Sequence, residues 1–160
     1  MGWLYYRNEY IMRCGRQHPA TWEVPVFAGS RAEPPGPNSF GEYVGLTFTK
    51  WEKGYTQCTL EINEKLLNPY RGLHGGVAFT MADSGMGGAL VSMLEKGEQC
   101  ATIEASIVYF RSVESGILTC ETKVIHKSRK VATLESEIRQ DGQLIAKAIG
   151  TWSIFRRRES

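Results

Sequence analysis

Alternation of apolar and polar residues is the dominant pattern of the chain, and one long apolar run interrupts it. The alternation begins near Tyr43, turns at Lys53–Gly54 and resumes until Ile62. Period-two alternation predicts half-buried β-strands, so two strands are expected here, followed by an irregular stretch over residues 63–73. The positions expected on the buried faces are Val44, Leu46, Phe48, Cys58, Leu60 and Ile62.

The apolar run from Gly75 to Leu94 predicts a helix that is apolar on most sides, because it is too long for a strand and does not alternate. Glu95–Lys96–Gly97 is expected to end it, with Gly97 as the glycine that follows the last turn. A membrane span is the alternative, but Asp83 would then place a charge inside the lipid, which is costly. We therefore expect a helix buried inside a soluble domain.

Four further strands are expected after the helix. Asp141–Gly142, a dipeptide typical of two-residue hairpin turns, separates the last two, and the final strand is expected over residues 144–155. The residues expected to share buried faces, strand by strand, are Ile103, Ala105, Ile107 and Tyr109; Leu118, Cys120, Thr122 and Val124; and Ala132, Leu134, Ser136 and Ile138.

The predicted order is two strands, one helix, then four strands. A single helix that is apolar on most sides needs a large cover, and an antiparallel sheet is the only candidate in this chain. The fold class is therefore α+β: an antiparallel sheet wrapped around one long central helix, which is the hotdog arrangement. At ~1.5 Å per residue the helix would be about 30 Å long, which matches a sheet of several strands.

The two ends of the chain differ from this domain. Residues 1–38 are interpreted as an N-terminal extension with an aromatic start, and the proline-rich stretch from Arg31 to Asn38 is typical of a linker. The hotdog domain is expected over residues 39–156, and residues 157–160 are interpreted as a basic, solvated tail. A chain of 160 residues, 22% of them charged, suits one globular domain.

Charge and cysteine usage narrow the function classes. A formal net charge of +2 is too small to favour nucleic acid as a partner. The four cysteines form no CxxC pair and the three histidines show no ligand spacing, so no metal and no other cofactor is expected. Arg7 and Glu9 interrupt the apolar start, so no secretory signal is recognised. We expect a cytoplasmic protein with free thiols and no membrane partner.

Asp83 is the one ionisable residue within the predicted helix. Aspartate is a poor helix former and is rarely buried without a partner. Gly76, Thr80 and Gly87 lie near it at helical spacing and leave room beside the carboxylate. A catalytic carboxylate is one interpretation. A structural aspartate that caps a neighbouring loop or bonds across a dimer is the other, and the residues alone leave both open.

Gly75–Gly76 lies where the helix is expected to begin. The first N–H groups of a helix lack partners within it, and the helix dipole adds positive charge there. Glycine lets a ligand approach that backbone closely, so this segment is a candidate for polarising a carbonyl group. A plain loop-to-helix junction is the alternative, and His74 by itself would more often be a structural hydrogen-bonding residue.

A set of residues with fixed spacing connects this loop to the helix: Asn68, Gly72, His74, Gly75, Gly76 and Asp83. The set resembles the signature of the phenylacetate-pathway (PaaI-like) hotdog acyl-CoA thioesterases. The stretch from Thr102 to Arg111 and the ending Ala146-x-Ala148-x-Gly150-Thr151 resemble the same family. The resemblance covers about residues 39–156, and residues 1–38 resemble no family.

The resemblance implies hydrolysis of an acyl-CoA thioester to a free acid and coenzyme A. Asp83 would act as nucleophile or general base, and the Gly75 N–H would polarise the carbonyl. His74 would orient the loop and contact the thioester, Asn68 would position the water or the carbonyl, and Thr102 would lie near the site. The family builds this site across a dimer interface, with the helix aspartate facing the partner's loop, and its dimers commonly pair into tetramers.

A basic segment suits the phosphates of coenzyme A. Arg111, Lys127, Ser128 and Arg129 are the candidate substrate-binding residues there, together with the Gly76 backbone beside the thioester. A solvated hairpin end is the alternative interpretation of residues 126–130.

Two rival functions remain open. A hotdog hydratase or dehydratase needs a histidine and a carboxylate poised on the carbon chain, whereas the histidine here belongs to the glycine loop. A non-catalytic acyl-CoA-binding or regulatory module would bind the thioester without a working carboxylate, and the presence of both Asp83 and Asn68 argues against it. The acyl group is not determined by the sequence.

Overall fold

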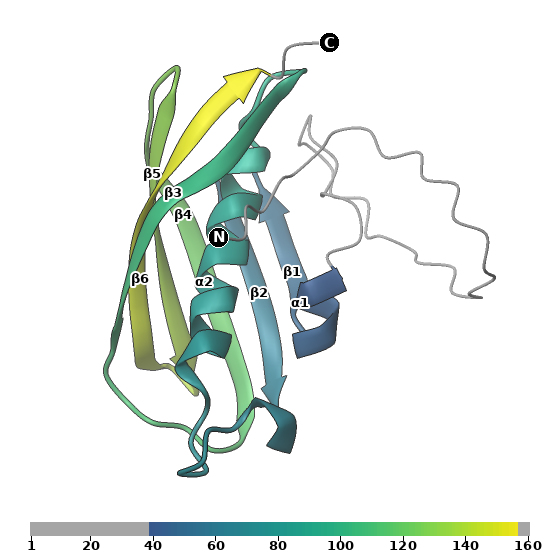
Figure 1. Ribbon diagram of the computed structural model, residues 1–160, viewed down its shortest axis with the longest axis vertical. Helices are drawn as coiled ribbons and strands as arrows, with labels where there is room; N and C mark the ends of the chain where they lie inside the picture. The colour runs from purple at the N-terminus through teal and green to yellow at the C-terminus, as the bar shows by residue number, and fades with distance from the viewer. Residues whose placement is uncertain (1–38, 157–160) are drawn as a thin grey trace, which may run out of the picture.

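A six-stranded antiparallel sheet curls around one helix in the computed structural model, which describes residues 39–156 (Figure 1). The strands lie in the order β1-β2-β4-β5-β6-β3. This arrangement confirms the predicted α+β class. In chain order the elements are α1 (Ser39–Val44), β1 (Thr47–Glu52), β2 (Tyr55–Ile62), the 3-10 helix η1 (Glu64–Leu66), α2 (Gly75–Val91), β3 (Glu98–Tyr109), β4 (Gly116–Lys127), β5 (Val131–Gln140) and β6 (Gln143–Arg156).

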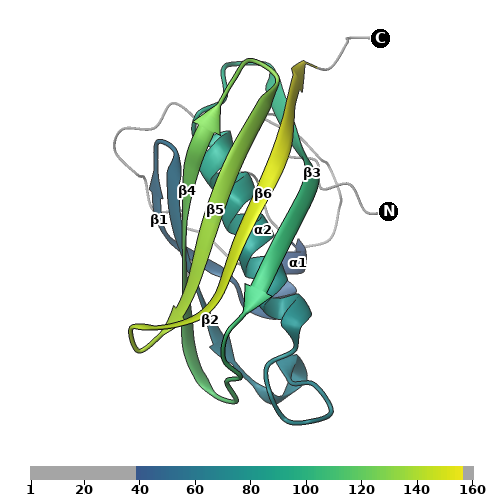
Figure 2. The ribbon, with the colours of Figure 1, turned by 90° about the vertical axis from the view of Figure 1, so that its left-hand side faces the viewer.

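The core lies between α2 and the concave face of the sheet, and Figure 2 shows the sheet in front of the helix. The predicted inward positions of β2, β4 and β5 are buried or packed against this core, so the alternation was interpreted correctly there. Asp141 and Gly142 form the β5–β6 turn with φ of 48° and 78°, the two positive values that such a hairpin turn requires.

Small residues let α2 approach the sheet closely. An added Cβ on Gly85 would lie 2.5 Å from the Thr122 hydroxyl, so no larger residue fits there. Buried hydroxyls face the helix at this point: Thr56 donates to the Gly85 carbonyl at 2.8 Å, and Ser136 donates to the Ala82 carbonyl at 3.3 Å. These hydroxyls are therefore satisfied although they are buried.

The first strand begins later than predicted, because residues 39–44 form a short helix. Gly45 ends this helix with φ of 81°, a conformation that glycine adopts without strain. Its N–H donates to Glu42, and the Leu46 N–H donates to Gly41, the paired bonds of a Schellman motif. The expectation of a strand starting near Tyr43 was therefore wrong.

The C-terminal end of α2 also differs from the prediction. The helix ends at Val91, and Gly97 lies in the following turn with φ of 81° instead of capping the helix. The Ser92 hydroxyl donates to the Ala89 carbonyl and accepts from the Gly54 N–H at 2.7 Å, which ties the helix end to the β1–β2 turn. The helix thus ends where Ser92 meets a distant segment of the chain.

A β-bulge changes the faces of β3. The pairing with β6 shifts between Thr102 and Glu104, so the residues before and after the bulge fall out of simple alternation. Ile103 and Tyr109, expected on the buried face, are 57% and 50% exposed, whereas Ala105 and Ile107 pack against the core as expected. The bulge turns Thr102 into an inward residue instead, beside α2.

Several expectations concern the ends of the chain and its thiols. The predicted extension (1–38), the basic tail (157–160) and Cys14 lie outside the described residues. Cys58, Cys100 and Cys120 are buried free thiols. Among residues 39–156, no helix is long and apolar enough to cross a membrane, and no group of three potential metal ligands occurs.

Candidate active site

Asp83 lies in the middle of α2, half-buried, beside β3. The Thr102 hydroxyl donates to its Oδ1 at 3.0 Å. Burial raises the pKa of the Asp83 carboxyl above its ordinary value, and the hydrogen bond from Thr102 opposes part of that rise by favouring the charged form. The structure therefore brings together two of the predicted site residues and gives Thr102 a defined role toward the carboxylate.

Cys100 is the other chemically reactive group near Asp83. Burial, assisted by the Asp83 charge, raises the pKa of the Cys100 thiol to about 12. A thiol with such a pKa carries almost no thiolate at neutral pH, and the thiolate is the nucleophilic form. Cys100 therefore does not compete with Asp83 as a nucleophile in its resting environment.

The N-terminus of α2 presents one free donor. The His74 Nδ1 accepts the Gly76 N–H at 3.0 Å, and the His74 carbonyl accepts the Val77 N–H at 2.9 Å. The Gly75 N–H makes no hydrogen bond with any residue between 39 and 156. Because the helix dipole adds positive charge at this end, the Gly75 N–H is the donor best placed to receive an oxyanion.

His74 acts as the N-cap residue of α2. Because the Nδ1 atom of His74 accepts a hydrogen bond, the Nε2 atom is the ring nitrogen that carries the proton. The side chain is exposed and its Nε2 remains the only ring donor. This geometry agrees with the expected role of orienting the loop, while any contact with a thioester stays a prediction.

The loop before the helix is organised by Asn68. Its Oδ1 accepts the Tyr70 N–H at 2.8 Å and the Gly72 N–H at 3.3 Å, so the side-chain oxygen is used within the loop. The amide nitrogen of Asn68 is consequently the end that remains for a ligand. Arg71, with φ of 70°, completes this tight turn by donating its N–H to the Asn68 carbonyl.

Tyr109 joins the site although the sequence did not single it out for chemistry. Its hydroxyl donates to the Gly75 carbonyl at 2.9 Å across 34 positions of the chain. The resemblance included Tyr109 within the stretch from Thr102 to Arg111, but no local spacing indicates that a strand residue would touch the helix start. The signal appears only once β3 is placed beside α2.

Within one chain, the two halves of the predicted site are apart. Asp83 follows Gly75 by eight residues on one helix, which corresponds to about 12 Å along the axis. The carboxylate therefore does not reach the Gly75 N–H of its own chain. The described residues of one chain therefore do not bring together the complete site that the resemblance implies.

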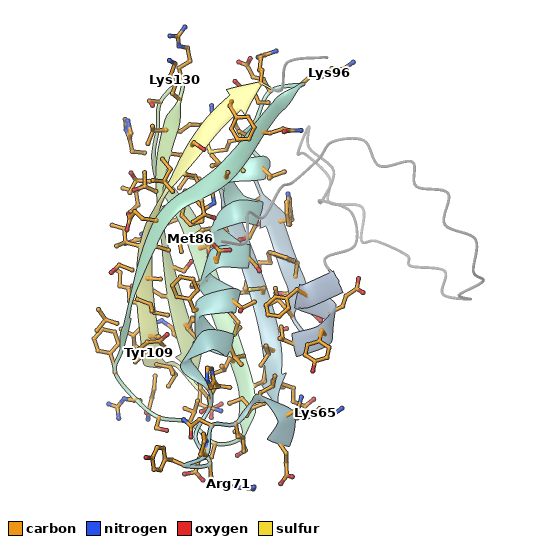
Figure 3. All side chains as sticks on the ribbon, in the orientation of Figure 1. Lys65, Arg71, Met86, Lys96, Tyr109 and Lys130 are labelled. Atoms are coloured by element: carbon orange, nitrogen blue, oxygen red, sulfur yellow. The ribbon has the colours of Figure 1, made fainter. Side chains whose placement is uncertain are left out.

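The candidate phosphate-binding residues also divide into two groups. Arg111 follows Tyr109 near the lower end of β3, whereas the β4–β5 turn that carries Lys127 and Arg129 leads to Lys130 at the upper end (Figure 3). Ser128 is occupied in this turn, because its hydroxyl donates to the Val131 carbonyl and accepts the Val131 N–H. One chain thus does not bring Arg111 together with residues 127–129.

β3 is the last strand of the sheet and pairs only with β6 among the described strands. Its outer edge therefore carries backbone groups that are free to pair with another strand. Large apolar side chains of β3 and of the residue that follows it are exposed: Ile103, Val108, Tyr109 and Phe110. Exposed apolar groups beside a free edge are typical of a surface that another chain covers.

Comparison with known proteins places this chain in a family. A family model described as the thioesterase superfamily matches residues 71–147. A protein of Saccharolobus solfataricus, whose name classes it provisionally as an esterase, is 34% identical over 119 residues, which cover 74% of this chain and 79% of the relative. A 1,4-dihydroxy-2-naphthoyl-CoA hydrolase of Listeria monocytogenes is 27% identical over 97 residues, 61% of this chain and 79% of that protein.

Solved structures agree with the fold. The phenylacetic acid degradation protein PaaI of Thermus thermophilus, in a mutant form, superposes with a TM-score of 0.68 at 24% identity, covering 72% of this chain and 98% of that one. The similarity supports the hotdog arrangement that the sequence resemblance implied. On the matched family model and the Saccharolobus relative, the chain belongs to the thioesterase superfamily.

Proposed function

We propose that the protein is an acyl-CoA thioesterase that hydrolyses its substrate to a free acid and coenzyme A. One observation carries the proposal: a half-buried carboxylate, hydrogen-bonded by Thr102, and a free N–H at the N-terminus lie on the same helix, α2. Thioester hydrolysis needs these two elements, a carboxylate and an oxyanion donor. The name of the Listeria relative, a CoA-thioester hydrolase, supports this substrate class.

The proposed active unit is a homodimer. The free edge of β3 and its apolar neighbours would pair with the same edge of a second copy about a two-fold axis. An antiparallel β3–β3 contact would face Asp83 of one chain toward the Asn68–Gly75 loop of the other. Dimerisation would thereby bridge the gap of about 12 Å that separates Asp83 from Gly75 in a single chain. Pairing of such dimers into tetramers is part of the same proposal.

In the proposed reaction, the Gly75 N–H receives the carbonyl oxygen of the thioester as it becomes an oxyanion. The Asp83 carboxylate either attacks the carbonyl carbon or removes a proton from the attacking water, and both routes remain open. The Asn68 amide nitrogen would position that water or the carbonyl. Collapse of the tetrahedral intermediate expels the coenzyme A thiolate, which then takes up a proton. On the water route this step gives the free acid directly; on the nucleophilic route it leaves an acyl–Asp83 anhydride, which water hydrolyses to the free acid and the regenerated carboxylate.

The same dimer would assemble the proposed phosphate site. Because the two β3 strands run in opposite directions, Arg111 of one chain would lie at the end of the dimer where the other chain carries Lys127 and Arg129. Paired guanidinium and ammonium groups suit the phosphates of coenzyme A. The backbone N–H and the hydroxyl of Ser128 both donate to the Val131 carbonyl, so Lys127 and Arg129 would carry this half of the proposed phosphate site.

A thiol-trapping assay with a panel of short, medium and aromatic acyl-CoA thioesters tests the function. We expect stoichiometric release of coenzyme A, with a preferred acyl group revealed by kcat/KM. Tight binding of acyl-CoA with no thiol release would instead favour a non-catalytic module. Loss of enoyl-CoA absorbance without thiol release would indicate a hydratase.

Replacement of Thr102 should change the pH dependence of the reaction. Thr102→Val removes the hydrogen bond that favours the ionised carboxylate, so the pKa of Asp83, already raised by burial, should rise further. Activity requires the ionised form and is lost as pH falls through this pKa. We therefore expect the acidic limb of the kcat–pH profile to move to higher pH.

Thr133→Val is the matched control, because the Thr133 hydroxyl makes no hydrogen bond with the part of the chain that the structure describes. Its profile should coincide with that of the wild type. An acidic limb that stays in place in Thr102→Val would remove Thr102 from the proposed site.

A further inference from the structure

We infer that Tyr109 is a positioning residue for the oxyanion donor, fixing the direction of the Gly75 N–H. The inference rests on the proposed function, in which this N–H receives the developing charge. Tyr109 would not touch the substrate; it would act through the backbone of the glycine pair.

The peptide group between Gly75 and Gly76 is held at both ends. The Tyr109 hydroxyl donates to its carbonyl oxygen at 2.9 Å, and the His74 Nδ1 accepts its N–H at 3.0 Å. Two hydrogen bonds on opposite ends of one rigid, planar group fix the orientation of that plane. The Gly75 N–H belongs to the preceding peptide group, whose His74 carbonyl accepts the Val77 N–H at 2.9 Å. Tyr109 therefore acts on the Gly75 N–H through the Gly75 Cα, which joins the two planes.

This clamp matters because two consecutive glycines are the softest point of the backbone. The direction of the Gly75 N–H depends on torsions on either side of it. An oxyanion donor is effective when it is aimed before the charge develops, so that no reorganisation is required during the reaction. Glycine does not restrict its own backbone, so the hydrogen bonds of Tyr109 and His74 supply that preorganisation.

The Tyr109 ring also leaves little room for a side chain at position 75. An added Cβ on Gly75 would lie 3.2 Å from both Cζ and Oη of Tyr109, closer than a side chain normally approaches. Burial raises the pKa of the Tyr109 hydroxyl, so it stays protonated and able to donate near neutral pH. Since β3 also carries Thr102, one strand positions the carboxylate through Thr102 and the oxyanion donor through Tyr109.

The test is Tyr109→Phe, which removes the hydroxyl and keeps the ring. Loss of one neutral hydrogen bond that acts in the transition state should lower kcat by about 3- to 10-fold. KM, the dimer mass and the acidic limb set by Asp83 should be unchanged. Tyr43→Phe is the matched control, because Tyr43 is 82% exposed on α1, and it should retain the wild-type kcat.

A second measurement does not depend on substrate. In the ¹⁵N-labelled protein, the order parameter of the Gly76 amide, which belongs to the clamped peptide, should fall in Tyr109→Phe and stay constant in Tyr43→Phe. An unchanged kcat and an unchanged Gly76 amide would overturn the positioning role while leaving the thioesterase proposal intact. A parallel change in KM and dimer mass would also overturn it, in favour of an interface role. A wild-type protein that releases no thiol overturns both.

Discussion

Asp83→Asn is expected to abolish acyl-CoA hydrolysis while the fold stays intact. The amide has the shape of the carboxylate and still accepts the Thr102 hydrogen bond, but it neither attacks a carbonyl nor removes a proton from water. General-base catalysis alone contributes about 10²- to 10⁴-fold, so kcat should fall at least that far. Steady-state assays of thiol release measure kcat, and circular dichroism confirms that the variant is folded.

The same variant should be more stable than the wild type near neutral pH. Burial raises the pKa of Asp83 in the folded chain above its value in the unfolded chain. A carboxyl whose pKa is raised in the folded state contributes its full stability below the pKa that it has in the unfolded chain. This contribution is lost as the pH rises through the pKa that it has in the folded chain. An amide has no charged form, so thermal melts of Asp83→Asn should exceed those of the wild type at pH 7, and the difference should shrink in acid.

Asp141→Asn is the control for both measurements. Asp141 is exposed in the β5–β6 turn with φ of 48°, a conformation that asparagine also tolerates. It should keep the activity and the pH-dependent stability of the wild type. Wild-type turnover by Asp83→Asn would contradict the proposed mechanism, and lower stability at pH 7 would contradict the assigned cause of the pKa shift.

The parts of the fold that follow from local periodicity could be predicted. Strands β2, β4 and β5 bury the expected residues, and α2 begins at the expected glycine, because alternation and helix-start signals depend on near neighbours. The missed helix over residues 39–44 is a local error, whereas the other errors occur where distant segments meet. Ile103 lies at a bulge that forms against β6, and the helix α2 ends at Val91, where Ser92 bonds to the turn at Gly54.

The residues of the candidate site also divide into those that local sequence spacing indicates and those that depend on distant contacts. Asp83 and His74 lie close to the glycine pair in sequence, so spacing was enough to single them out. The Tyr109 contact spans 34 positions and depends on how β3 crosses the helix start, which no sequence pattern records. The separation of Asp83 from Gly75 along one helix was implied by the spacing itself, and it gives the dimer hypothesis its physical basis.

Mixing two inactive variants should restore activity if the site is shared between chains. Asp83→Asn keeps an intact Asn68–Gly75 loop. Asn68→Asp keeps the intact Asp83 and the side-chain oxygen that accepts from Tyr70 and Gly72, but loses the amide donor. A heterodimer of the two contains one complete site. Random subunit exchange makes half of the dimers heterodimers, so thiol release should recover to about a quarter of the wild-type rate.

The converse mixture makes this result decisive. In the second experiment, wild type is mixed in equal amount with the double variant Asp83→Asn/Asn68→Asp. If the site is shared, each site of a heterodimer then contains either the intact Asp83 or the intact Asn68, but never both. Only wild-type homodimers remain active, so the rate should fall to about a quarter of that of an all-wild-type sample, whereas a site built within one chain would retain about half. No recovery in the first mixture, with half the rate in the second, would place Asp83 and Asn68 in the same subunit's site. Because about 12 Å of helix separates Asp83 from Gly75 within one chain, the shared arrangement is the one that the geometry favours.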